Sequence, residues 1–396
     1  MSGDNKSNIN NSYKLYDRVV NLLGISESLS LKPLILYEKF KDDYCNNDDC
    51  SDIRCILHKN LMDINKILNF KQNIFTYIKS GAYGHTFKGS LNGIQYAMKI
   101  VAYSKLDEYG DFNDIKRPEN TEIKMLCMLS KLVINDITPH IVLPVCTFNT
   151  SIKTLLQTDI GITINEKSKK FVEHYNNKDY HDTISILISE WIQGGDLGDY
   201  LRDNYTKLSK LHWQVLFFQI ISTLALIQEH YPSFRHNDLK ANNILIDFIP
   251  LDTKIFKYTI NKNDYYIPNV GFVIKLWDFD FSNIINLCSN NKVNFSDWNT
   301  DINVTPIKNK YYDLHYFFNS LTKKGFIKNF YESQSVHNDI KSFIRRIIPI
   351  QYMSSNIITK RGRIKINKEY ITPITVIEND TLFDIFRDIN LIVDYI

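Results

Sequence analysis

The run from Val215 to Ile227 constrains the fold most, because it is apolar on almost every side. It lies within the stretch "WQVLFFQIISTLALIQEHY" and is interrupted only by Gln219, Ser222 and Thr223. The run is shorter than the roughly 20 residues that a bilayer span needs. A helix that is apolar all round must instead be covered by other elements. The sequence therefore predicts a core helix in a chain whose 396 residues can form one or two domains.

The residues before this run predict a small β-rich half. The segments "IFTYIKSGAYGHTFKGSL" and "IQYAMKIV" are β-branched and aromatic, and Asn92-Gly93 between them is a hairpin signal. The next segment, "RPENTEIKMLCMLSKL", has apolar residues at the 3.6-residue spacing of an amphipathic helix. Two more strands are predicted at "HIVLPVCTF" and "TISILISEWI", separated by a polar surface insertion at about 151–182.

The second half is predicted to be mostly helical. "YYDLHYFFNSL" and "VHNDIKSFIRRIIP" predict helices, whereas "NNILI" and "FVIKLWDF" predict short strands around an insertion at about 247–271. This order indicates an α+β protein with two lobes. The N-lobe, about 73–192, is β-rich with one main helix, and the C-lobe, about 193–396, is mostly helical.

Residues 1–72 are interpreted as an N-terminal extension. The first 25 or so are rich in Asn and Ser and are expected to be disordered, and the remainder is expected to be helical, as in "LKPLILYEKF" and "LMDINKILNF". The start, "MSGDNKSNINNS", lacks the apolar core of a secretory signal. A cluster in the extension could bind zinc, although its spacing matches no common pattern and local packing is the alternative: Cys45, Cys50, Cys55 and His58.

Composition indicates a soluble, intracellular protein. A net charge of +3 is too small to indicate a nucleic-acid or membrane partner. Cys127, Cys146 and Cys288 are isolated in the sequence, as reduced core thiols usually are.

Two candidate site features lie in the β-rich half. Gly81 and Gly84 in "KSGAYGHTFKG" would let backbone N–H groups approach phosphate oxygens, although taken alone they fit a plain hairpin turn better. Lys99 stands alone in the apolar strand "YAMKI". A buried ammonium needs an anionic partner, for which Glu122 or ligand phosphates are candidates. The alternative is a half-exposed lysine at the surface.

Two more candidate features follow the core helix. In "RHNDLKANNILI", Asp238 could accept or orient a hydroxyl proton, Lys240 could neutralise a transferring phosphoryl group, and Asn243 could bind a divalent cation. In "KLWDFDFS", a predicted strand ends at Asp278, and a carboxylate there suits Mg²⁺. Each feature has an ordinary structural explanation, but their fixed order favours phosphoryl transfer.

From about Ile74 to the C-terminus the chain resembles the eukaryotic-type protein kinases. The shared features occur in order: a Gly-rich loop, a strand Lys, a helix Glu, His-x-Asp-x-Lys-x-x-Asn and Asp-Phe-x. "SEWIQGGDLGDYL" is similar to the family's hinge, which implies that adenine bonds to the backbone from Glu190 to Ile192 and that Ser189 is the gatekeeper. The resemblance also implies adenine between Ala97 and Leu245, with Asp196 near the ribose.

The resemblance further implies ATP and Mg²⁺ as ligands and a Ser or Thr hydroxyl of an unidentified protein as acceptor. Asn243 and Asp278 would bind the metal, and Asp238 and Lys240 would be catalytic. The remaining implied roles are structural: Leu126, Phe279 and His236 would stack in an apolar spine, and Asp313 would hold the catalytic-loop backbone. "HNDLK" with "DFD" looks most like the kinases of large DNA viruses, of the poxvirus and giant-virus types, which would place the protein in the host cytoplasm or virion.

Four departures from the kinase pattern leave alternatives open. Lys79 replaces the first loop glycine, no Ala-Pro-Glu follows, and Asp280 replaces a glycine, so that Asp278 should be held near one position. Asn237 replaces the Arg that pairs with a phosphorylated activation loop, which predicts activity independent of that phosphorylation. The alternatives are a catalytically silent kinase-fold scaffold and a small-molecule kinase.

Overall fold

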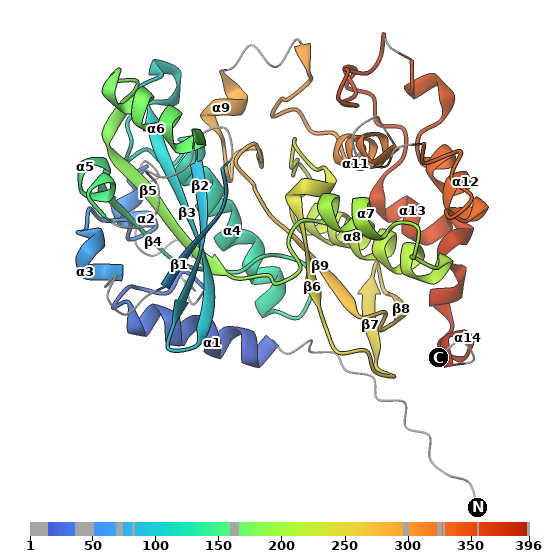
Figure 1. Ribbon diagram of the computed structural model, residues 1–396. Helices are drawn as coiled ribbons and strands as arrows, with labels where there is room; N and C mark the ends of the chain where they lie inside the picture. The colour runs from blue at the N-terminus through green and yellow to red at the C-terminus, as the bar shows by residue number, and fades with distance from the viewer. Residues whose placement is uncertain are drawn as a thin grey trace, which may run out of the picture.

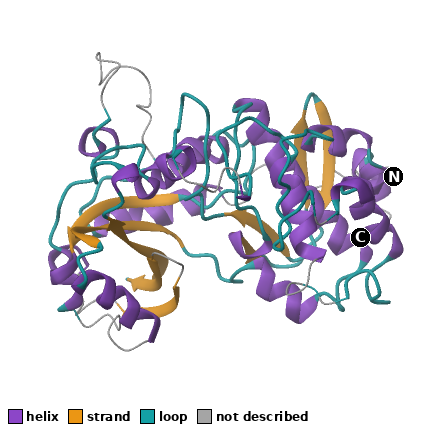
Figure 2. Cartoon of the chain, turned by 90° about the horizontal axis from the view of Figure 1, so that it is seen from above, coloured by secondary structure: helices purple, strands orange, loops and turns teal. Residues whose placement is uncertain are grey.

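The computed structural model describes residues 15–35, 51–68, 74–80, 84–158, 166–295, 301–322, 327, 329–354 and 356–393. It has the predicted α+β architecture, with an antiparallel five-stranded sheet in the N-terminal part and a mostly helical C-terminal part. Figure 1 shows the two parts side by side, and Figure 2 shows the same division from above.

The sheet of the N-lobe has the strand order β1-β2-β3-β5-β4. Asn92 and Gly93, with φ of 52° and 81°, form a two-residue turn between β2 and β3, as predicted. Helix α4 packs against β4. The N-lobe elements after residue 73 are β1 (Ile74–Ser80), β2 (Gly84–Leu91), β3 (Ile94–Ser104), η1 (Asp107–Tyr109), α4 (Pro118–Ile134), β4 (Pro144–Ser151), α5 (Ile152–Leu156), α6 (Glu166–Asn176) and β5 (Tyr180–Glu190).

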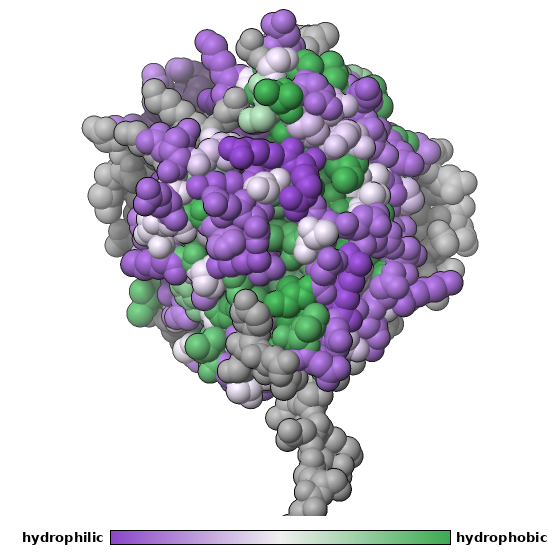
Figure 3. All heavy atoms as spheres, turned by 90° about the vertical axis from the view of Figure 1, so that its right-hand side faces the viewer, coloured by the Kyte–Doolittle hydropathy of each residue, from purple (hydrophilic) through white to green (hydrophobic). Residues whose placement is uncertain are grey.

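Helix α8 (Lys210–His230) is the centre of the C-lobe, as the apolar run predicted. Among the described residues it is the one helix long and apolar enough to cross a bilayer, but 89% of its apolar window is buried inside the protein. The C-lobe face in Figure 3 is largely hydrophilic, with apolar side chains showing between polar ones.

The C-lobe contains further helices and strands besides α8. They are α7 (Leu197–Asn204), η2 (Ala241–Asn243), β6 (Ile244–Phe248), β7 (Ile255–Ile260), β8 (Asn263–Pro268), β9 (Phe272–Leu276), α9 (Asn291–Asn294), α11 (Tyr312–Thr322), α12 (Asn338–Ile347), η3 (Ile350–Tyr352), α13 (Pro373–Asn379), η4 (Thr381–Arg387) and α14 (Ile389–Val393).

Both predicted insertions contribute packed structure. Within 151–182, Phe171 of α6 is buried, and its ring lies 5.1 Å from that of His85 on β2. Within 247–271, strands β7 and β8 form a hairpin, and Tyr258 packs edge-on against Phe218 of α8. The second insertion therefore extends the core of the C-lobe.

The expected disorder of the first 25 residues is wrong for residues 15–25, because these belong to helix α1 (Leu15–Ser28). Leu22 and Ile25 are buried, and α1 contacts β3 and β4. The expectation rested on the Asn- and Ser-rich composition of the start, whereas the apolar residues of this segment have the spacing of a helix. Residues 1–14 lie outside the described residues.

The rest of the extension is only partly helical. Helices α2 (Ile53–Ile56) and α3 (Ile64–Leu68) are short. Residues 31–35 are not helical: the Leu34 N–H donates to the Val145 carbonyl at the edge of the sheet, 2.7 Å away. Cys45 and Cys50 lie outside the described residues, and Cys55 is exposed, so the zinc site stays a prediction.

We expect Ile25→Ala to destabilise the protein by about 2–5 kcal/mol, because it removes buried methyl groups between α1 and the sheet. Chemical denaturation of the full chain measures the change. Val20→Ala on the same helix is the matched control, because Val20 is 46% exposed. Equal stability of both variants would show that α1 does not contribute to the fold.

Candidate active site

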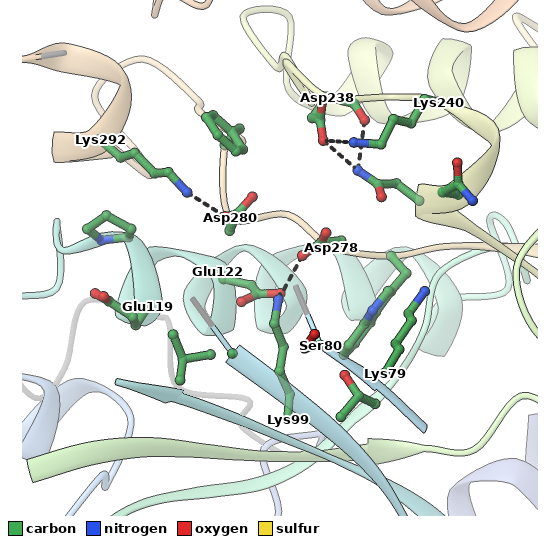
Figure 4. A pocket seen from close by; sticks show the side chains of 18 of the residues that line it. Lys79, Ser80, Lys99, Glu119, Glu122, Asp238, Lys240, Asp278, Asp280 and Lys292 are labelled. Atoms are coloured by element: carbon green, nitrogen blue, oxygen red, sulfur yellow. Dashed lines mark hydrogen bonds and ion pairs between the residues drawn. The ribbon is translucent and has the colours of Figure 1, made fainter. Parts of the chain in front are cut away.

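The candidate site is a cleft of about 850 Å³ between the lobes. Lys99 and Glu122 reach it from the N-lobe, and Asp238, Lys240 and Asp278 reach it from the C-lobe (Figure 4). Asn243, Gly84 and Asp196 also line it. Residues far apart in the sequence thus meet in one cleft.

Lys99 on β3 joins the two lobes at the centre of the cleft. Its Nζ lies 2.7 Å from Oε1 of Glu122 on α4 and 2.7 Å from Oδ1 of Asp278. Burial alone would lower the pKa of Lys99, but the two carboxylates outweigh burial and raise it. Burial opposes the ionisation of Asp278 as well, yet the Lys99 ammonium keeps the pKa of that carboxyl below its usual range. Lys99 is therefore a fixed positive charge.

The catalytic loop holds the Asp238 carboxylate from several sides. Lys240 Nζ lies 2.7 Å from Asp238 Oδ2, and the Asn243 amide nitrogen donates to the same oxygen and to the Asp238 carbonyl, both at 2.9 Å. The loop backbone is fixed by the buried Asp313 of α11, which accepts the N–H groups of His236 and Asn237 at 2.7 and 2.9 Å. Asp313 therefore has the loop-holding contacts that the resemblance implied.

In the Asp-Phe-Asp segment the Asp278 carboxylate pairs with Lys99 and the Asp280 carboxylate pairs with Lys292. Asp278 has a left-handed φ of 64°, and the buried Phe279 ring lies 4.9 Å from the His236 ring. Asp280 Oδ2 pairs with Lys292 Nζ at 2.6 Å, and the Lys292 side chain is buried (Figure 4). Lys292 thus balances the extra carboxylate beside Asp278.

Lys79 and Gly84 line the cleft, and each has a structural role there. Lys79 Nζ lies 3.3 Å from Asp196 Oδ2, across the cleft, so the residue at the first loop-glycine position contacts the other lobe. Asp196 also caps α7 through the Asp199 N–H, a structural role beside the ribose role expected for it. A Cβ on Gly84 would lie 2.6 Å from the Ile100 carbonyl, so strand pairing itself requires this glycine. Gly81 lies outside the described residues.

The residues expected around adenine lie on β3, on β6 and at the end of β5, and they do not line the cleft. Ala97 pairs in register with Ser189, and Leu245 forms a bridge with Asp196. Neither Ala97, Leu245, Glu190 nor Ile192 lines the cleft. Their adenine-binding roles stay predictions.

Glu190 makes a contact that the sequence reasoning missed. Its carboxylate receives Arg18 of α1 in two bonds, Nη2 to Oε1 at 2.6 Å and Nε to Oε2 at 3.0 Å. Arg18 also donates to the carbonyls of Pro139 and Ile141. Burial works against ionisation of Glu190, but Arg18 keeps the pKa of this carboxyl below its usual value. Helix α1 is therefore bonded to the last residue of β5, which belongs to the predicted hinge.

A second missed residue is Arg363, which comes from the C-terminal segment. Its guanidinium pairs with Asp238 Oδ1 and donates to the Asn237 carbonyl. The basic run "KRGRIK" was the only sequence signal for it, and a basic run usually lies at the surface.

The fold and the site together define a protein kinase: a five-stranded sheet with a Lys–Glu pair stands over a helical lobe that carries a His-x-Asp loop. Comparison with known proteins gives the family. A family model described as poxvirus serine/threonine protein kinase matches residues 195–389. The chain belongs to this poxvirus-type family of serine/threonine protein kinases, whose activity uses ATP and a protein substrate.

Three relatives support this assignment, and the names of all three place them among the serine/threonine-protein kinases. One protein of Acanthamoeba polyphaga mimivirus is 41% identical over 402 residues, covering 98% of this chain and 84% of the relative. Another from the same virus is 26% identical over 342 residues, covering 75% and 85%. A Dictyostelium discoideum protein is 32% identical over 102 residues, which is 25% of this chain and 8% of the relative.

We expect Arg18→Ala to lower the free energy of unfolding by about 3–5 kcal/mol, because it leaves the buried Glu190 carboxylate without its cation. Thermal or chemical unfolding measures the loss. Tyr16→Ala, on the same helix with Tyr16 78% exposed, should change little. A double-mutant cycle with Glu190→Gln isolates the pair, and additive effects would contradict a direct interaction.

Proposed function

We propose that this kinase is active and transfers the γ-phosphoryl group of ATP to serine or threonine hydroxyls, with the roles assigned below. The observation that carries the proposal is the facing arrangement of two groups across one cleft. Lys99, bonded to Glu122 and Asp278, stands opposite the loop that carries Asp238 and Lys240 (Figure 4). A silent scaffold has no need for this complete set.

Lys99 is the group proposed to bind the α- and β-phosphates, with Glu122 holding it in place. In the structure, Asp278 is the second partner of Lys99. Nucleotide phosphates would compete for the ammonium with Asp278 and free that carboxylate for a cation.

Asn243 and Asp278 suit Mg²⁺ as a pair of oxygen donors. The side-chain nitrogen of Asn243 donates to Asp238. The side-chain oxygen, Oδ1, is therefore the atom that would face a cation. The Asp278 side chain is 34% exposed to the cleft. Mg²⁺ held there would offset the charge of the nucleotide phosphates.

In the proposed transfer, the acceptor hydroxyl oxygen bonds to the γ-phosphorus while the bond from that phosphorus to the β,γ-bridging oxygen breaks. ADP keeps the electron pair of the broken bond. Asp238 orients the hydroxyl and takes its proton, and Lys240 stabilises charge on the moving phosphoryl group. Because the rate of transfer depends on positioning and electrostatics, loss of any contact that holds these side chains should lower it.

Asp238→Ala tests the catalytic role. We expect phosphoryl transfer to fall by about 10²–10⁴-fold, because the variant lacks the base. Radiolabelled ATP with a basic protein substrate measures transfer, and a thermal shift with Mg²⁺ and ATP measures nucleotide binding, which should persist. Asp384→Ala is the control, since Asp384 forms an exposed pair with Arg387 in the same lobe.

Two results would count against this proposal. Equal labelling by wild type and Asp238→Ala would exclude catalysis by this loop. Nucleotide binding without any transfer by the wild type would favour the silent scaffold, and transfer to small molecules alone would favour a small-molecule kinase.

The activation segment is taken as the stretch from Ser282 to Thr305, and its described residues, 282–295 and 301–305, are held by contacts that need no phosphate. The Asn237 side-chain amide donates to the carbonyls of Phe281 and Thr305. The Thr121 hydroxyl of α4 donates to the Ser289 carbonyl at 3.2 Å, and the Asn291 N–H donates to the Lys116 carbonyl at 2.8 Å. These neutral bonds tie the segment to both the catalytic loop and α4.

We therefore expect phosphatase-treated protein to keep its activity, and replacement of Ser289, Ser296 and Thr300 by Ala to change kcat less than about tenfold, because no charge pair is lost. Initial rates with dephosphorylated protein measure this. Ser282 and Thr305 are unsuitable for the test, because both take part in buried hydrogen bonds. Loss of activity on phosphatase treatment, restored by rephosphorylation, would contradict the prediction.

A further inference from the structure

A hairpin from the C-terminal segment reaches the catalytic loop. Ile358 and Ile364 pair antiparallel, and Gly362 forms the turn with a φ of 94°. The Asn319 side chain of α11 donates to the Gly362 carbonyl at 2.8 Å, and the Asn303 side chain donates to the Ile364 carbonyl at 3.1 Å. The hairpin is thus anchored to α11 on one side and to the end of the activation segment on the other.

The Arg363 side chain of this hairpin is almost completely enclosed by other residues. Its side chain is 9% exposed, and its charge lies 4.3 Å from the centre of the Tyr316 ring. It donates to the Tyr312 hydroxyl at 3.3 Å, to the Asn237 carbonyl and to Asp238 Oδ1. The guanidinium therefore touches the backbone and the side chain of the catalytic loop at the same time.

We propose that Arg363 is a positioning residue for Asp238, an inference that rests on the proposed function. Lys240 and Asn243 hold one carboxylate oxygen of Asp238, and Arg363 holds the other. With both oxygens held, the carboxylate plane is fixed and cannot rotate away from the acceptor hydroxyl. Asn237 carries no charge, and the guanidinium beside Asp238 belongs to Arg363, which lies 125 residues further along the chain.

The opposite function, an inhibitory plug that keeps substrate from Asp238, fits the geometry less well. A plug has to leave when the enzyme is active. Gly362 is buried against α11, where a Cβ would lie 3.3 Å from the Ser320 nitrogen. Arg363 also bonds Tyr312 of α11. Release of the hairpin would expose all of these groups, so the contact is built to be permanent.

The full chain with Arg363→Ala and Arg363→Lys tests the inference through kcat and the KM for ATP. We expect Arg363→Ala to lower kcat about 100-fold with little change in the KM for ATP, because the base is misplaced while the nucleotide site is intact. Arg363→Lys keeps the charge but loses the forked geometry, so its kcat should be intermediate. Low concentrations of guanidinium chloride should partly restore Arg363→Ala.

The matched control is Arg346→Ala. Arg346 makes the same forked contact to a carboxylate in the same lobe, with bonds of 2.7 and 2.8 Å to Asp380. This variant should keep kcat and KM. Its melting temperature, compared with that of Arg363→Ala, shows how much of a rate change could follow from lost stability alone.

Several outcomes would overturn the inference alone, while Asp238→Ala still lowers transfer as expected under the proposed function. An unchanged kcat in Arg363→Ala would remove the positioning role, and a higher kcat would show an inhibitory contact. Equal losses in the Ala and Lys variants, with a raised KM for ATP and no effect of guanidinium, would show a purely structural role. Absence of transfer by the wild type would instead overturn the proposed function itself, and the inference with it.

Discussion

The buried ammonium of Lys99 is the charge on which the arrangement of the cleft depends. A lysine in the interior is costly unless anions surround it. Here Glu122 comes from α4 and Asp278 from the segment after β9, each 2.7 Å from Nζ. The pairing therefore fixes the distance between the sheet, the helix and the C-lobe. Removing either carboxylate would leave the ammonium with a single anionic partner and would break one of the two connections.

The sequence predicted those parts of the structure whose physical cause is local. Asn92-Gly93 marked its turn because both residues take up left-handed φ readily. The all-apolar α8 could only be a core helix. The order of Lys99, Asp238 and Asp278 also indicated one site, although none of the three was decisive alone.

Contacts across long stretches of sequence could not be predicted in this way. Arg18 and Glu190 are 172 residues apart, and each has an ordinary local context. The Asn- and Ser-rich start also hid the helix that carries Arg18. In the sequence, Gly84 suggests close approach of phosphate to the backbone. In the fold, a side chain at Gly84 is excluded because its Cβ would clash with the Ile100 carbonyl of the neighbouring strand. These facts depend on the assembled fold and leave little trace in one sequence.

Three of the four departures from the usual kinase pattern, at Lys79, Asp280 and Asn237, each face a group from elsewhere in the chain. Lys79 pairs with Asp196 across the cleft, and Asp280 pairs with the buried Lys292. Asn237 contributes no cation, but its own carbonyl accepts Arg363. A substitution that left a charge or a polar group unbalanced in this cleft would weaken the site. Because Lys79 and Asp280 are each paired with an opposite charge, these two departures leave no unpaired charge of their own in the cleft.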